Sequence, residues 1–155
     1  MKLPIIERRR IEALILKHVY DALEASQGKE VAVATIDAAV SRAAAAFGEE
    51  HRQALGRTPD LADMAAILPN WSADDALRIE VLEARPDRLD FNVTRCRYAE
   101  MYKEMGLGGI GHILSCNRDG QFCTGYNPDM KLDRSQTIMQ GASHCDFRYK
   151  LDKTS

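Results

Sequence analysis

The fold class is decided by the stretch Leu77-Arg-Ile-Glu-Val-Leu-Glu-Ala-Arg-Pro-Asp-Arg-Leu-Asp-Phe-Asn-Val-Thr94. Apolar and polar residues alternate from Leu77 to Val81 and again from Leu89 to Thr94, and this period of two is typical of half-buried β-strands. Between the two runs, Arg85-Pro-Asp-Arg88 has the composition of a tight turn. The stretch therefore predicts an antiparallel hairpin.

The residues before this hairpin follow a helical period. Apolar residues recur at helical spacing from Glu7 to about Ser26 and from Lys29 to about Leu55. Gly28 and Gly56 stand where each of these segments should end, and glycine is the usual residue at a helix end. The pattern predicts two long amphipathic helices.

A third, shorter helix is expected before the hairpin. Asp60 is a helix-capping residue, and the helix should run through Ile67 until Pro69 stops it. The only tryptophan, Trp71, is then expected in a loop.

Helical spacing returns after the hairpin. A helix is expected from Cys96 to Met105, with Cys96 in or just before its first turn. A further helix should contain both His112 and Cys116 and should end before Asn127, which precedes a proline.

Two final strands complete the predicted sheet. They are expected at residues 132–140 and 145–151, and the tail from Asp152 to Ser155 should fray. The order helices, hairpin, helices, hairpin predicts an α+β fold in which the helices pack against one face of a four-stranded antiparallel sheet. We expect one domain over residues 1–155, helical over about residues 5–70, with the sheet and the site in about residues 75–151.

Composition narrows the class of protein. Hydrophobic residues at 45% and charged residues at 28% are typical of a globular domain, and a net charge of −2 without a basic face argues against nucleic-acid binding. The sequence shows neither a signal-peptide core nor, by this reading, a stretch of membrane-spanning length, so we expect a cytoplasmic protein with reduced thiols. The alanine-rich second helix favours a homo-oligomer, although the oligomeric state stays open.

Reactive side chains are concentrated in the last third of the chain. Three of the four cysteines lie between residues 116 and 145. On a helix, Cys116, Asp119 and Cys123 fall at i, i+3 and i+7, so that two thiols and a carboxylate would line one face. Each cysteine taken alone is equally compatible with a core position, because free cysteine is among the most buried residue types.

Several separated motifs of this region resemble one known family, the 2-aminothiazoline-4-carboxylate hydrolases, over roughly residues 89–151. The motifs are Cys96-x-Tyr98, Tyr102-Lys-Glu-x-Gly106-Leu107, Cys116-x-x-Asp119, Gly125-x-Asn127-Pro128, Thr137-Ile, Gly141 and Cys145-Asp-Phe147. The resemblance implies a hydrolase-like domain related in fold to vinyl-reductase-type and TRAPP-like ligand-binding domains. Members named for the activity open a cyclic isothiourea to a carbamoyl-cysteine.

Opening such a ring requires a nucleophile at the amidine carbon and a carboxylate that holds the protonated nitrogens. We assign Cys116 as the nucleophile and Asp119 as the carboxylate, with Cys145 as a supporting catalytic group. The expected partner is a small-molecule substrate, and no metal or other cofactor is expected.

Six residues are predicted to contact the substrate: Cys96, Asn127, Thr137, His112, His144 and Arg148. The first three are carried over from the family pattern. The two histidines and Arg148 are inferred from this sequence alone, with Arg134 or Arg148 as the group that would hold a substrate carboxylate.

Two other classes of function remain open. Cys116, Cys123, His112, His144 and Cys145 are residue types that bind zinc, although their spacings match no common zinc motif. The other alternative to a hydrolase is a ligand-binding module without turnover. The sequence leaves open the ring of the substrate, the bond that breaks and the attacking thiol.

Overall fold

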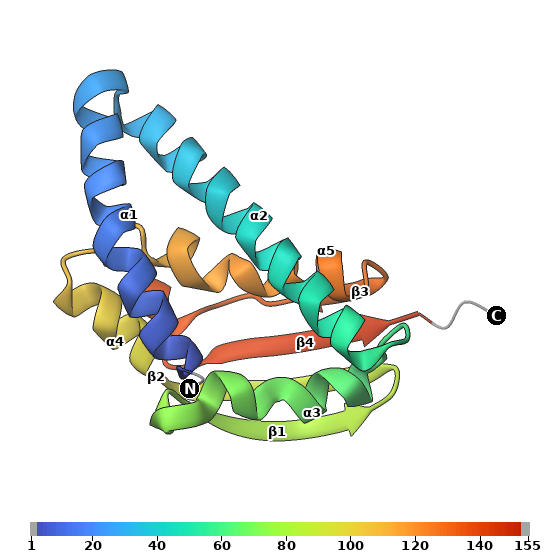
Figure 1. The fold of residues 1–155 in the computed structure, drawn as a ribbon. Helices are drawn as coiled ribbons and strands as arrows, with labels where there is room; N and C mark the ends of the chain where they lie inside the picture. Colours follow the sequence, from blue (N-terminus) through green and yellow to red (C-terminus); the bar gives the residue numbers. More distant parts are fainter. Residues whose placement is uncertain (1–2, 153–155) are drawn as a thin grey trace.

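The computed structural model describes residues 3–152 and shows helices gathered on one face of a single sheet (Figure 1). The strands are Leu77–Arg85 (β1), Arg88–Cys96 (β2), Met130–Asp133 (β3) and Cys145–Leu151 (β4). Their order in the sheet is β1-β2-β4-β3, and every neighbouring pair is antiparallel. The predicted α+β class and the four-stranded antiparallel sheet are confirmed.

The two long helices are also present. They are Ile5–Gln27 (α1) and Lys29–Leu55 (α2), followed by Leu61–Ser72 (α3), Arg97–Glu104 (α4) and Arg118–Tyr126 (α5). Short helical turns lie at Ala73–Asp75 (η1), His112–Cys116 (η2) and Ile138–Gln140 (η3). Gly28 and Gly56 end α1 and α2 with φ angles of 92° and 78°, which glycine adopts more readily than other residues.

The long helix α2 rests on α5, and α5 in turn contacts the sheet side of the domain. Two glycines allow the close approach: a Cβ atom on Gly48 would meet the backbone of Phe122, and one on Gly125 would meet the backbone of Ala45. The helices α3 and α5 therefore contact the sheet, and α2 packs on α5.

The helices α1 and α2 form a hairpin that projects beyond the body of the molecule (Figure 1). Within residues 3–152, α2 is the one helix that is long and apolar enough to cross a membrane by length and composition. The expectation that no stretch approaches this length is therefore wrong for residues 29–55. The observation is weak evidence for a membrane span, because the core helix of a soluble protein passes the same test.

Two local predictions are corrected around α3. Asp60 caps the helix as expected, with its side chain accepting from the Asp63 N–H at 3.0 Å. Pro69, however, lies inside the helix, and Trp71 belongs to its last turn. The Tyr98 hydroxyl donates to the Trp71 carbonyl at 2.9 Å, so a tertiary contact satisfies the helix end that the proline was expected to interrupt.

Two further predictions are corrected in the last third. The expected single helix through His112 and Cys116 is divided, because η2 is a π-helical turn in which the Asn117 N–H donates to the His112 carbonyl. The strand expected at residues 132–140 is shorter and begins earlier, at Met130, and only its last three residues form η3. The strand at residues 145–151 is confirmed, and of the tail expected to fray, 152–155, all residues after Asp152 lie outside the described residues.

Candidate functional site

A cavity region lies between the helices and the inner face of the sheet, and it has two adjoining parts. Each part has a volume of about 60 Å³ that water can occupy, whereas a single water needs roughly 10–15 Å³ of such volume. Each part can therefore hold several waters. The two parts share one wall, formed by Arg9, Trp71, Leu77, Val93, Arg118, Asp119 and Phe147.

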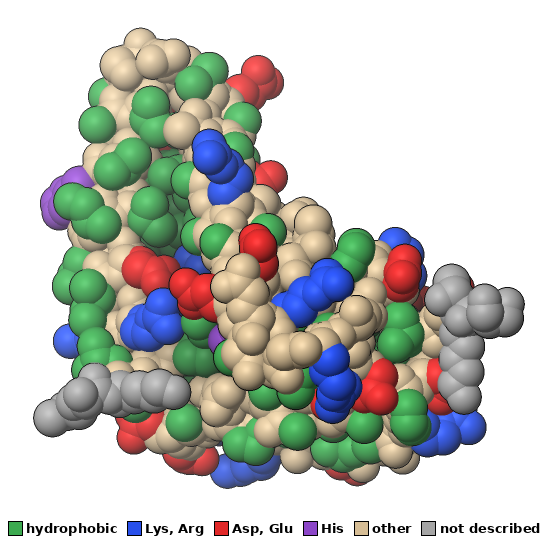
Figure 2. Space-filling view, turned by 45° about the vertical axis from the view of Figure 1, so that its right-hand side comes forward, with side chains coloured by type: hydrophobic (Ala, Val, Ile, Leu, Met, Phe, Trp, Pro, Cys, Tyr) green, Lys and Arg blue, Asp and Glu red, His purple; other side chains and the backbone are tan. Residues whose placement is uncertain are grey.

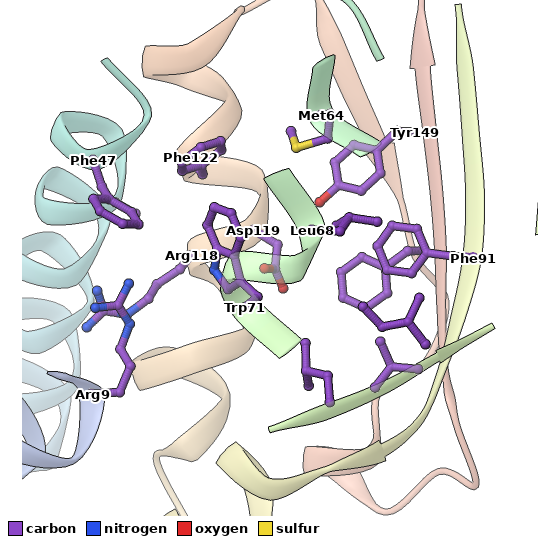
Figure 3. A pocket seen from close by; sticks show the side chains of 15 residues that line it. Arg9, Phe47, Met64, Leu68, Trp71, Phe91, Arg118, Asp119, Phe122 and Tyr149 are labelled. Atoms are coloured by element: carbon purple, nitrogen blue, oxygen red, sulfur yellow. The ribbon is translucent and has the colours of Figure 1, made fainter. Parts of the chain in front are cut away.

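We call the first part the aromatic chamber. Besides the shared wall, it is lined by Ala44, Phe47, Met64, Leu68, Ile79, Phe91, Phe122 and Tyr149 (Figure 3). Trp71 and Phe122 meet edge to face with ring centroids 5.2 Å apart, and Phe91 stacks on Phe147 at 4.7 Å. Such a lining binds flat apolar groups well, because aromatic rings bury large areas and interact by their edges and faces.

We call the second part the thiol chamber. Besides the shared wall, it is lined by Cys96, Tyr98, Ser115, Cys116, Arg134 and Cys145. Strand pairing explains part of this convergence, because Cys145 is the register partner of Val93, which lies three residues before Cys96 on β2. The structure thus brings three of the predicted site cysteines and Asp119 to one cavity.

An ion pair between Asp119 and Arg134 lies in the wall of this chamber. Arg134 Nη1 donates to Asp119 Oδ2 at 2.7 Å, and its Nη2 donates to the Cys116 carbonyl at 2.9 Å. The Arg134 guanidinium also lies 5.0 Å from the centroid of the Phe147 ring. The side chains of Arg134 and Asp119 are 12% and 26% exposed, as expected for a deeply placed pair whose carboxylate opens onto a cavity.

Burial dominates the electrostatics of these groups. It raises the pKa of Asp119, and the charge of Arg134 opposes this rise. Within residues 3–152, Asp119 Oδ1 has no recorded hydrogen-bond partner, although it is not sealed from solvent. One oxygen of the carboxylate is therefore free to accept hydrogen bonds from a ligand.

The three thiols are protonated at neutral pH in the free protein. Burial raises the pKa of Cys116 to about 12, and the neighbouring Asp119 adds to the rise. Burial raises the pKa of Cys96 to about 11, although its Sγ accepts the Ala99 N–H at the start of α4. Cys96 thus caps α4, as the sequence predicted.

Cys145 lies in a different electrostatic setting. Burial raises its pKa as well, but its Sγ accepts the Ile138 N–H at 3.2 Å, and this hydrogen bond opposes the rise. At Cys145, the charge of Arg134 lowers the thiol pKa by more than the charge of Asp119 raises it. At Cys116, the charge of Asp119 has the larger effect, and it raises the thiol pKa. Of these two thiols, Cys145 is the one whose surroundings oppose the thiolate less.

Two residues carried over from the family pattern lie away from the cavity wall. Asn127 is buried, donates to the Pro59 carbonyl at 2.8 Å and accepts the Asp129 N–H, so it fixes the turn after α5. Thr137 is buried and its hydroxyl accepts the Gln140 N–H, which caps η3. Both side chains stabilise the loops that carry the site and line neither chamber.

The three residues inferred from this sequence alone also line neither chamber. Arg148 donates to the Phe91 and Phe147 carbonyls and to Asn92. His144 contacts Gln136 and Ser143 in the loop before β4. His112 and Cys116 are the first and last residues of the π-helical turn η2, and only Cys116 lines the thiol chamber.

Cys123 is buried in the apolar cluster behind α5, where its thiol donates to the Asp119 carbonyl at 3.6 Å. It does not line the same chamber as Cys116, contrary to the one-face expectation. Within residues 3–152, no three His, Cys, Asp or Glu side chains are grouped so that they could hold a metal ion.

A family model described as L-2-amino-thiazoline-4-carboxylic acid hydrolase matches residues 8–149. A search of curated proteins found no match. Among solved structures, the phenol-responsive sensory domain of the transcription activator PoxR, crystallised with phenol, is similar with a TM-score of 0.54 at 11% identity. This similarity covers 92% of the present chain and 74% of the sensory domain, and it is a similarity of fold.

Proposed function

Because the chain belongs to the L-2-amino-thiazoline-4-carboxylic acid hydrolase family, we propose that it is a hydrolase that opens a small cyclic amidine or isothiourea-type compound in the thiol chamber. The gathering of three thiols and the Asp119–Arg134 pair around one cavity is the observation that carries this proposal. A core of this size needs no such groups for packing alone.

Asp119 has the role of holding the amidine. Its free oxygen Oδ1 accepts the N–H groups of a protonated amidine, while Oδ2 stays with Arg134. Arg134 opposes the rise that burial causes in the pKa of Asp119, which favours the ionised form, and its hydrogen bond fixes the orientation of the carboxylate. The bound cation in turn lowers the pKa of a neighbouring thiol at the moment when a thiolate is required.

We assign the attack to Cys145 in place of Cys116, which the sequence had favoured. The physical reason is electrostatic: Arg134 and the Ile138 N–H stabilise a Cys145 thiolate, whereas Asp119 opposes a thiolate at Cys116. Cys116 and Cys96 then shape the chamber around the reacting carbon.

The proposed reaction has two steps. The Cys145 thiolate bonds to the amidine carbon, the ring bond from that carbon to its heteroatom breaks, and the heteroatom takes the proton that the thiol released. Water then attacks the same carbon, the carbon–Sγ bond breaks, and the thiol recovers a proton. For a cyclic isothiourea the product is a urea with a free thiol, and one water is consumed overall.

The test is turnover of cyclic isothioureas and cyclic amidines, followed by intact-protein mass spectrometry during turnover. We expect an adduct of substrate mass on the wild-type protein and its absence in Cys145→Ser, with turnover lowered roughly a thousandfold or more. Cys123→Ser is the matched control, because Cys123 is equally buried but lies outside the chamber. A fully active Cys145→Ser protein would return the assignment to Cys116.

A second candidate function is ligand binding without turnover. The aromatic chamber and the fold shared with a sensory domain favour it. In that case ligand affinity should persist in Cys145→Ser and Cys116→Ser, and no compound of either class should be hydrolysed. Hydrolysis that depends on one of these thiols excludes this second function.

A further inference from the structure

We propose that Arg9 and Arg118, in place of Arg134 or Arg148, form the subsite that binds the substrate carboxylate where the two chambers meet, so that the apolar part of the substrate lies in the aromatic chamber. The inference rests on the proposed function, because it assigns the residues that bind one group of that substrate. Both arginines belong to the wall that the chambers share, and they come from α1 and α5.

The two guanidinium groups share a single carboxylate. Arg9 Nη1 donates to Glu12 Oε1 at 2.9 Å, and Arg118 Nη2 donates to Glu12 Oε2 at 3.2 Å. Arg118 Nε is held by the Leu114 carbonyl at 2.6 Å. The side chains of Arg9 and Arg118 are 7% and 11% exposed, whereas that of Glu12 is 36% exposed. Two buried guanidinium groups thus form ion pairs with the same half-exposed carboxylate.

The charges around the cavity do not balance. Asp119 neutralises Arg134, and Glu12 neutralises one of the two remaining arginines. One positive charge is left, and an uncompensated charge in a buried site is unfavourable. A ligand carboxylate would supply the missing negative charge, and arginine is the side chain best suited to bind it.

Donors for such a carboxylate are present. Among the described residues, Arg9 Nη2 and Arg118 Nη1 have no recorded acceptor, and neither atom is sealed from solvent. Figure 3 shows both side chains beside Phe47 and Phe122 at the edge of the aromatic chamber. A carboxylate bound here places an attached ring among aromatic side chains, with Asp119 on the same shared wall for a cationic group.

Trp71 provides a direct readout of binding. It is the only tryptophan and lines both chambers, so a ligand in the cavity should change its fluorescence. The probes are 3-phenylpropionate and the matched neutral alcohol, 3-phenylpropan-1-ol. We expect the carboxylate to bind about tenfold to a hundredfold more tightly, the value of a charge-assisted hydrogen bond. Equal affinity for the two probes overturns the proposal.

Variants that should weaken and variants that should strengthen carboxylate binding complete the test. Arg118→Gln and Arg9→Gln should remove the preference for the carboxylate while the alcohol binds as before. Glu12→Gln should strengthen carboxylate binding, because it releases both guanidinium groups from their shared anion. A carboxylate affinity that is unchanged or lowered in Glu12→Gln contradicts the subsite, even if an arginine variant fails to fold.

The same measurements separate this subsite from the proposed chemistry. In Cys145→Ser the carboxylate preference should persist without turnover. If the protein prefers the carboxylate probe but hydrolyses no substrate, the subsite is supported and the hydrolase proposal is contradicted. If it hydrolyses neutral and anionic substrates equally well, the hydrolase proposal is supported and the subsite is contradicted.

A second observation concerns the outer face of α1, and from it we infer that two copies of this chain pair through α1. Ile11, Leu14, Ile15 and Val19 are 54%, 56%, 62% and 39% exposed and recur at i, i+3, i+4 and i+8. This is the spacing of a helix face that packs on a neighbour. Figure 2 shows exposed apolar side chains along the projecting hairpin.

The charges beside this stripe identify a second copy as its partner. Arg10 and Asp21 are both exposed and lie eleven residues apart, which is close to three helical turns and puts them on one side of α1. Their midpoint along the helix lies between Ile15 and Leu16, at the level of the stripe. If two α1 helices pack antiparallel about a two-fold axis there, Arg10 faces Asp21 of the partner subunit at both ends.

Light scattering during size-exclusion chromatography tests this pairing. We expect a dimer for the wild type, a monomer for Ile15→Glu, and a dimer for Leu82→Glu, since Leu82 is a 51% exposed apolar residue on β1, away from the stripe. Asp21→Arg should weaken the dimer roughly tenfold, and adding Arg10→Asp should restore it. A monomeric wild type, or a charge exchange that restores nothing, overturns the inference.

Discussion

The aromatic chamber and the thiol chamber share a wall but are assembled from different kinds of element. Rings of the aromatic chamber stand in the middle of regular helices and strands, as Phe47 does in α2, Phe91 in β2 and Phe122 in α5. Groups of the thiol chamber stand at ends and irregular turns. Cys96 caps α4, and Cys145 is the first residue of β4.

This difference follows from what each chamber must contain. An apolar wall needs rigid, closely packed rings, which regular elements supply. A thiol that is to become a thiolate needs unpaired backbone N–H groups, which are found where helices begin. The Ala99 N–H at Cys96 and the Ile138 N–H at Cys145 are such groups. The aromatic chamber is therefore expected to govern binding, and the thiol chamber the chemistry.

The largest expected effect comes from Asp119→Asn in the thiol chamber. The change removes the charge that holds the amidine and leaves Arg134 buried without its ion pair. We expect kcat/KM to fall roughly a hundredfold and the free energy of unfolding to fall by about 2 kcal/mol. Steady-state kinetics and urea denaturation measure the two losses. Stability lost with activity intact would show that the pair is only structural.

A smaller effect is expected from pH. Burial raises the pKa of the Cys145 thiol, so the free protein is mostly in the inactive thiol form at neutral pH. The ratio kcat/KM should therefore increase with pH above neutrality, by about tenfold per pH unit, until either the thiol or the protonated amidine of the free substrate loses its proton. The profile of kcat should level off at lower pH, because the bound cation favours the thiolate. A kcat/KM that falls as pH rises through this range contradicts thiolate attack.

The smallest effect is expected in the aromatic chamber. Phe122→Leu preserves an apolar wall but removes the edge-to-face contact with Trp71. We expect KM for an aryl-bearing substrate to increase about threefold to tenfold, since an aromatic pair is worth roughly 0.5–1.5 kcal/mol, with kcat unchanged. Val81→Leu on the exposed part of β1 serves as a matched surface control. A large loss of kcat in Phe122→Leu would break the division between the chambers.

Local features of the structure follow closely from the sequence. The alternation at residues 77–94 predicts the β1–β2 hairpin, and Gly28 and Gly56 predict the bounds of α2. The capping role of Asp60 and the position of Cys96 before α4 were also predicted. Each of these features depends on the conformational preferences of a few neighbouring residues, which a single sequence reveals directly.

The failures occur where distant contacts override those preferences. Pro69 predicts a helix end, yet α3 continues, and the Tyr98 hydroxyl satisfies its last turn. The spacing of His112 and Cys116 predicts one α-helix face, yet Cys116 lines the thiol chamber and His112 lines neither chamber. Arg134 was noted as an alternative to Arg148 for a substrate carboxylate, but its pairing with Asp119 depends on the fold of residues 130–140.

The sequence by itself determined the α+β class, the antiparallel sheet and the family, and it indicated a group of thiols and one acid as candidate site residues. Tertiary structure alone decided that Cys96, Cys116 and Cys145 surround one cavity and that Asn127 and Thr137 support loops outside it. It also decided that Arg9 and Arg118, from opposite ends of the chain, share Glu12. The physical reason is the distance along the chain over which each effect acts. Periodicity and capping act over a few residues, whereas these contacts between distant residues depend on the strand order and on the packing of α1 and α2 over α5.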